Sequence, residues 1–135
     1  MKLSDLQEDL SKDVPIDQTK LVYEAANNPV VYSKWAIKFS NAKKEITTLE
    51  AKKKKLLKAK LDYYSGRGDE ISMDRYERSE MKTVLSGDQE ILKIDTAIEY
   101  WQIILNFIGD AMDTIKSRGF AIKHVIDIRS FEEGR

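Results

Sequence analysis

The sequence contains no cysteine, one histidine, two prolines and six glycines. The absence of cysteine excludes disulfides, thiolate catalysis and cysteine-ligated zinc or iron–sulfur centres. The scarcity of proline and glycine predicts long, uninterrupted elements. No stretch approaches the roughly 18 consecutive apolar residues of a membrane span, and the first residues lack the apolar core of a signal peptide. We therefore expect no membrane partner and a cytoplasmic location.

Patterns that carry catalysis or metal binding are also missing. His124 is the one histidine, so no Ser–His–Asp arrangement stands out. The glycine-containing segment Gly66–Gly68 matches neither the Walker nor the dinucleotide-binding pattern. Asp69, Glu70 and Asp74 do not have the spacing of an EF-hand loop. We expect no enzymatic activity, no cofactor and no metal.

The chain is rich in charge but has none in excess. It has 135 residues, of which 34% are charged and 41% hydrophobic, and its formal net charge is zero. This length suits a single domain, 1–135, and this composition favours long helices with solvated faces. We divide it into N-terminal helices (1–64), a loop with a short helix (65–87) and C-terminal helices (88–135).

Local signals predict two short helices at the N-terminus. Ser4 fits the N-cap of the first, which should end before Val14-Pro15 because the residue preceding a proline avoids the helical region. Asp17 can cap a second helix over about 18–26. Asn27-Asn28-Pro29 then predicts a kink or a break.

A long helix is predicted over 30–64. Its apolar residues recur every three or four positions, as a coiled-coil-like seam requires. Lys53 and Lys60 fall inside this apolar stripe, where a lysine is costly unless its ammonium reaches water or an anion. The apolar positions are Trp35, Phe39, Ala42, Ile46, Leu49, Leu56, Leu57, Tyr63 and Tyr64.

In the second half of the chain, the sequence predicts a loop at 65–69, a short helix over 72–84 and a break at 86–88. Asp88 offers the N-cap of a new helix there. A helix with unbroken three-four spacing follows, and Gly119 is its natural end. The remaining residues, 120–131, fit a helix and also a strand. The spaced residues are Ile91, Ile94, Ile98, Trp101, Leu105, Ile108, Met112 and Ile115.

The positive charge is concentrated in one segment. Ten lysines lie between Lys34 and Lys60, against Glu45 and Glu50. Lysines there can neutralise phosphates, and the aromatic and arginine side chains that follow can stack on exposed bases. This pattern is typical of single-stranded nucleic-acid binding. A solvated helix face explains the lysines almost as well. The candidate DNA-binding residues are Lys54, Lys55, Lys58, Lys60, Tyr64 and Arg67.

The C-terminal helix has more apolar surface than one packing partner needs, since Ile104, Phe107 and Ala111 widen its stripe. This excess favours self-association, which would also strengthen weak DNA contacts through effective concentration. We expect an all-α, long, hairpin-like subunit with an apolar C-terminal helix. The candidate oligomerisation residues are Ile98, Trp101, Ile104, Leu105, Ile108 and Met112.

Several segments resemble the recombination mediator (UvsY) family of T-even-like bacteriophages. The likeness spans essentially the whole chain and is most specific at Lys58–Asp69 and Met73–Ser86. It continues at Tyr23–Asn28, Tyr32–Trp35 and Ile115–His124.

This resemblance implies a ring-like homo-oligomer that binds single-stranded DNA in the cytoplasm of an infected bacterium. It implies loading of the phage RecA-like recombinase onto DNA covered by single-strand-binding protein, with contacts to both proteins. Lys58 and Lys60 are implied as DNA contacts and the C-terminal helix as the assembly element. The alternative is a coiled-coil scaffold without nucleic-acid binding. In that case lysines at positions 53 and 60 have no evident purpose.

Overall fold

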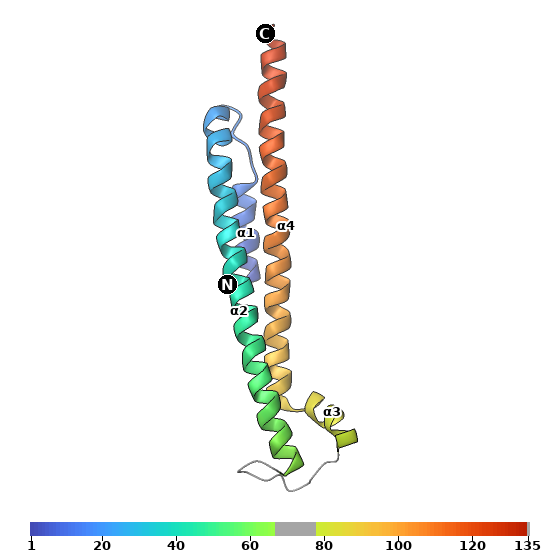
Figure 1. Cartoon of the computed structure of the whole chain (residues 1–135). Coiled ribbons are helices and arrows are strands. Elements are labelled where there is room, and N and C mark those ends of the chain that lie inside the picture. Colours follow the sequence, from blue (N-terminus) through green and yellow to red (C-terminus); the bar gives the residue numbers. More distant parts are fainter. Residues whose placement is uncertain (67–77, 135) are drawn as a thin grey trace. The chain divides into compact units, whose positions relative to one another are not determined.

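The computed structural model describes residues 1–66 and 78–134, and over these ranges it contains helices and no strand. The helices are α1 (Leu3–Asp13), α2 (Leu21–Ser65), α3 (Arg78–Ser86) and α4 (Gln89–Glu132) (Figure 1). The all-α prediction is confirmed. The first part of the helix expected over 72–84 lies outside the described residues, and the strand alternative for 120–131 is wrong because α4 contains that segment.

The chain forms two compact units, and both long helices contribute to each of them. The first unit comprises Met1–Ala42 and Ile103–Arg135, and the second comprises Lys43–Gln102. This division does not follow the three segments expected from the sequence, because α2 and α4 each run through both units.

In the first unit, α2 and α4 pack antiparallel. Glu24 pairs with Arg118, whereas the later residue Trp35 places its ring against the earlier residue Phe107, with 6.3 Å between ring centres. Helix α1 joins this pair through Asp13, whose Oδ2 accepts a hydrogen bond of 2.9 Å from Trp35 Nε1. Lys34 also pairs with Asp13 and lies 3.1 Å from Asp9 Oδ1. The predicted end of α1 before Val14-Pro15 is confirmed.

The buried face of α4 differs from the predicted register. Where α4 belongs to the first unit, its fully buried residues are Ile104, Ile108, Ala111, Ile115 and Ile122. Their spacing of three, four and seven residues is that of a helical seam. Leu105 and Met112, which the sequence placed in the seam, are only half-buried. The predicted seam positions Ile108 and Ile115 are therefore confirmed, whereas Ile104 and Ala111 replace Leu105 and Met112.

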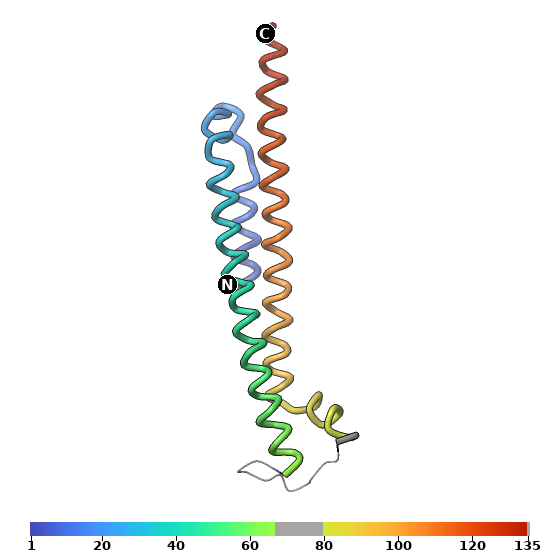
Figure 2. Tube along the Cα trace, viewed as in Figure 1, coloured from blue at the N-terminus to red at the C-terminus, as the bar shows by residue number. Residues whose placement is uncertain are grey.

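Two predicted helix ends are wrong. Helix α2 continues through Asn27-Asn28-Pro29, and α4 continues through Gly119, so that both traces are unbroken coils (Figure 2). Local propensity is a weak constraint that tertiary packing overrides.

The N-caps predicted at Ser4 and Asp17 differ from those of the structure. Ser4 lies inside α1, whose N-cap is Lys2, and Asp17 precedes α2 by a turn in which its Oδ1 accepts hydrogen bonds from Thr19.

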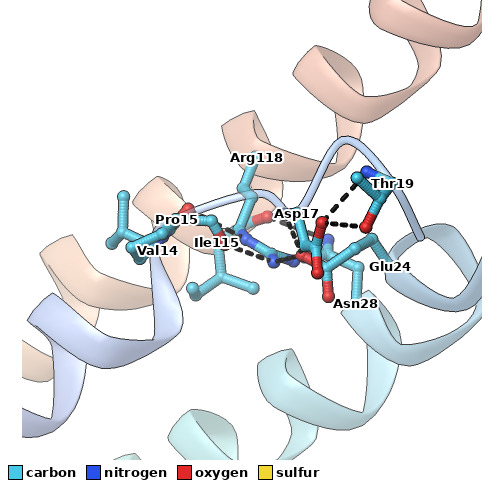
Figure 3. A network of polar contacts seen from close by, with 8 residues as sticks. All are labelled: Val14, Pro15, Asp17, Thr19, Glu24, Asn28, Ile115 and Arg118. Carbon is cyan, nitrogen blue, oxygen red and sulfur yellow. Dashed lines mark hydrogen bonds and ion pairs between the residues drawn. The ribbon is translucent and has the colours of Figure 1, made fainter. Parts of the chain in front are cut away.

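A buried polar network explains why both helices continue (Figure 3). The Arg118 guanidinium donates to the carbonyl oxygens of Val14 (3.0 Å) and Pro15 (2.8 Å), to Asn28 Oδ1 (2.8 Å) and to Glu24. Asn28 Nδ2 in turn donates to the Ile115 carbonyl over 3.0 Å. The Asn28 bond joins a side chain of α2 to the backbone of α4, and the Arg118 bonds join a side chain of α4 to α2 and to the segment before it, so the network fits helices that continue through both predicted breaks.

Candidate nucleic-acid interface

The second unit contains the centre of the lysine segment, on the C-terminal part of α2. Ile46 is buried there and Leu57 is half-buried, so the opposite side of the helix faces solvent. Lys54, Lys55 and Lys58 are exposed on it, and none of them forms an ion pair with any residue that the structure describes. The prediction of an exposed lysine face is met by these three side chains, which we call the lysine triad.

Lys53 and Lys60 differ from the triad because acids of the same chain hold them. Lys53 Nζ lies 2.7 Å from Asp95 Oδ1 on α4. Lys60 Nζ lies 3.4 Å from Asp88 Oδ2 and 3.3 Å from Glu90 Oε1. Their position in the apolar stripe favoured a functional basic patch. The structure places internal carboxylates beside both ammonium groups, and the role of Lys60 as a DNA contact stays a prediction.

Asp88 is the centre of this arrangement, with a side chain only 5% exposed. Its Oδ1 accepts hydrogen bonds from the backbone N–H groups of Glu90 (2.9 Å) and Ile91 (3.2 Å), which confirms the predicted N-cap of α4. Its Oδ2 accepts a hydrogen bond of 2.6 Å from the Tyr64 hydroxyl and faces Lys60. One carboxylate thus joins the end of α2 to the start of α4.

The pKa values follow from these contacts. Burial alone would raise the pKa of Asp88, but the hydrogen bonds from Tyr64, Ile91 and Glu90 and the charge of Lys60 hold it below its ordinary value. Burial alone would lower the pKa of Lys60, but Glu90 and Asp88 raise it above its ordinary value. The hydrogen bond to Asp88, with burial, raises the pKa of Tyr64. The lowered pKa of Asp88 and the raised pKa values of Lys60 and Tyr64 favour an ionised carboxylate, an ionised ammonium and a neutral phenol at these three residues.

The two tyrosines are half-buried. Tyr63 packs edge-on against Tyr64 with 5.0 Å between ring centres, and Lys60 Nζ lies 5.9 Å from the Tyr63 ring centre. Because the Tyr64 hydroxyl is bonded to Asp88, this candidate stacking residue is tied to the fold. Arg67 lies outside the described residues. Asp88 and Glu90 were missed as partners of Lys60, and their signal in the sequence was only the expected cap at Asp88.

The candidate oligomerisation residues fall into two groups. Ile98, Trp101, Leu105 and Met112 are half-buried within the chain. Ile104 and Ile108 are completely buried in the core of the first unit, and so is Ala111. The prediction that Ile104 and Ala111 widen an uncovered face is therefore wrong. The exposed large apolar residues of α4 are instead Leu92, Tyr100, Ile103, Phe120, Ile128 and Phe131.

The described residues offer no group of three or more histidine, cysteine, aspartate or glutamate side chains suited to a metal ion. His124 is exposed on α4. Across residues 1–66 and 78–134, no helix has the length and apolar character that crossing a membrane would require.

The fold and these charges define an all-helical protein with a cationic face on one long helix. A crystal structure of the bacteriophage T4 recombination mediator protein UvsY (lattice type II) has the same fold. It is 64% identical, with a TM-score of 0.89 and 98% of each chain covered. A second crystal form (lattice type IV) is 63% identical, also has a TM-score of 0.89, and the match covers 97% of this chain and 99% of that one.

Sequence comparison agrees with the structural match. The recombination protein uvsY of Enterobacteria phage T4 is 64% identical over 137 aligned positions, which cover the whole of both chains. The family model described as recombination, repair and ssDNA binding protein UvsY matches residues 9–135. The chain belongs to the UvsY family, as its sequence segments indicated.

Proposed function

We propose that this protein is a recombination mediator, which binds single-stranded DNA and loads a RecA-like phage recombinase onto strands covered by single-strand-binding protein. The observation that carries the proposal is the lysine triad of Lys54, Lys55 and Lys58, exposed and without an acidic partner among the described residues. Membership of a family described by recombination, repair and single-stranded DNA binding supports it. The proposed place of action is the cytoplasm of an infected bacterium.

The triad suits phosphate neutralisation. Exposed ammonium groups release the counterions that condense on a nucleic-acid strand, which makes the affinity fall with rising salt. A patch of three lysines binds weakly by itself. In the proposed mechanism a ring-like homo-oligomer presents several patches to one strand, and the effective concentration of the later patches raises the overall affinity.

Self-association is proposed to use the half-buried residues Ile98, Trp101, Leu105 and Met112 of α4 rather than its fully buried ones. Partly covered apolar side chains gain from further burial, whereas Ile104 and Ile108 have no surface left to bury. Wrapping the strand around such an assembly would loosen the covering protein and expose sites for recombinase nucleation.

A nucleation assay tests this function. A RecA-like phage recombinase is added to single-stranded DNA precovered with phage single-strand-binding protein, and filament formation is followed by its DNA-dependent ATPase activity. The wild-type protein should shorten the lag before filament growth, and a Lys54→Ala/Lys55→Ala/Lys58→Ala variant of unchanged mass and helicity should not. A lag that the wild-type protein leaves unchanged would contradict the loading mechanism.

A further inference from the structure

Lys60 is the lysine near the end of α2 that already has anions beside it. Its side chain is 20% exposed, and its ammonium lies 3.4 Å from Asp88 Oδ2 and 3.3 Å from Glu90 Oε1. The lysine triad, less than two helical turns earlier, has no such partners among the described residues. Two carboxylates thus occupy the space beside Lys60 that a DNA phosphate would need.

The two carboxylates are not equivalent. The Asp88 side chain is 5% exposed and also caps α4 and accepts the Tyr64 hydroxyl. The Glu90 side chain is 65% exposed, and within the described ranges it pairs with the Lys60 ammonium alone. An exposed ion pair is weak and easily exchanged, whereas a buried acid with several donors is held in place. A phosphate could therefore replace Glu90 and leave the Asp88 cap intact.

We propose that Glu90 is an internal competitor of DNA phosphate for Lys60, and that it thereby sets the affinity of the end of α2 for single-stranded DNA. The inference rests on the proposed DNA-binding function. In it, Lys60 exchanges the outer carboxylate for a phosphate while Asp88 keeps the ammonium beside the strand. Glu90 is then an affinity-determining residue that touches no DNA itself.

Glu90→Gln tests the proposal because it removes the competing charge at an exposed position while keeping the shape of the side chain. Binding to fluorescent oligothymidylate is measured at several salt concentrations, with helicity and mass as checks. The variant should bind about two- to fivefold more tightly, the range that corresponds to the loss of one exposed ion pair.

Removing any acidic side chain would raise the affinity for DNA somewhat, because the overall electrostatic field of the protein becomes more positive. Glu99→Gln, an equal charge change at an exposed position of α4 in the same unit, measures that effect. The same two substitutions are then made in a Lys60→Met background. The excess gain of Glu90→Gln over Glu99→Gln should vanish there, because the ammonium for which Glu90 competes is gone.

The outcomes separate the two hypotheses. If the wild-type protein does not bind the strand, the proposed function fails and this inference fails with it. If the wild-type protein binds but Glu90→Gln gains no more than Glu99→Gln, or gains equally in the Lys60→Met background, the competitor role is overturned and DNA binding stands. An excess gain that depends on Lys60 supports the inference.

Discussion

The Arg118 guanidinium holds α4 to the segment that connects α1 with α2. It is 8% exposed, and its donors reach two backbone carbonyls, the Asn28 amide and the Glu24 carboxylate. Only arginine offers five donors in a planar fork, so lysine could not make this set of bonds. Among the described residues, no buried side-chain polar atom is left without a partner.

Arg118→Met should therefore destabilise the fold strongly. It leaves the buried Glu24 charge unpaired and removes four hydrogen bonds, and breaking a buried pair in this way costs about 3–5 kcal/mol. Urea denaturation followed by circular dichroism measures it. Arg129→Met is the control, since Arg129 is exposed and its guanidinium bonds to Gln18 alone among the residues that the structure describes. It should cost less than about 1 kcal/mol, and equal losses would contradict the role given to the network.

The lowered pKa of Asp88 predicts how the stability of the fold changes with pH. Its pKa in the fold lies below the ordinary value of 3.8, so its ionised form stabilises the fold. That stability is fully present above pH 3.8 and is lost as the pH falls through the lowered pKa. Asp88→Asn should consequently be most harmful near neutral pH.

Denaturation midpoints of wild type and Asp88→Asn, measured from pH 7 down to pH 2, check this sign. The gap between them should narrow as the solution becomes more acidic than pH 3.8. Glu99→Asn, at an exposed position of α4, should give a small gap. A gap for Asp88→Asn that widens toward low pH would show that the carboxylate is not held in its charged form.

At the scale of helices, the two predicted breaks that the structure does not contain, at Asn27-Asn28-Pro29 and at Gly119, lie at one contact between α2 and α4. Gly119 was expected to end a helix. Instead it allows α2 and α4 to approach closely, because a Cβ at this position would lie 2.8 Å from Asn28 Nδ2. The amide occupies this space in order to reach the Ile115 carbonyl. Glycine and asparagine are thus kept inside helices, at a cost in propensity, by a bond between distant parts of the chain.

Two glycines of α4 provide a matched pair. Gly119→Ala should destabilise the fold by about 1–2 kcal/mol, since displacing the Asn28 amide costs more than helix propensity returns. Gly109→Ala should stabilise it by about 0.5–1 kcal/mol, because its Cβ would meet Phe39 at 3.7 Å, an ordinary contact. Thermal unfolding of both variants tests the assignment, which fails if Gly119→Ala is also stabilising.

The sequence predicts elements well where the signal is local. The end of α1 before Val14-Pro15 and the Asp88 cap of α4 follow from the chemistry of adjacent residues. The continuity of α2 through Pro29 depends on contacts with residues some 90 positions away, which no local pattern contains. The pairing of Lys60 with Asp88 and Glu90 depends on a tertiary contact in the same way.

For the candidate site, composition identified the segment but not the state of each lysine. The exposed triad is the part that helical periodicity could predict, because it lies opposite the apolar stripe. Lys53 and Lys60 belong to the stripe, and only the fold brings Asp95, Asp88 and Glu90 beside them. Periodicity likewise could not distinguish the buried Ile104 from the half-buried Leu105, since both lie on the broad apolar side of α4.

At the scale of the whole molecule, a chain of zero net charge can still bind a polyanion. The excess positive charge lies in one segment of α2, where Lys53 and Lys60 pair with acids of α4. The triad has no such partner among the described residues, and it is a small patch on each chain. In the proposed mechanism, binding at physiological salt requires several subunits on one strand, and assembly would thereby be linked to affinity.

The most direct measurement is the salt dependence of single-stranded DNA binding, with mass determined alongside. Lys54→Ala/Lys55→Ala/Lys58→Ala should reduce the slope of log affinity against log salt by about 2 per subunit engaged, because each lost phosphate contact removes about 0.7. The control Lys20→Ala/Lys116→Ala/Lys123→Ala removes three exposed charges from the first unit and should leave the slope nearly unchanged. A triad variant that keeps the wild-type slope, as an intact assembly, would contradict the claim that these lysines bind the strand.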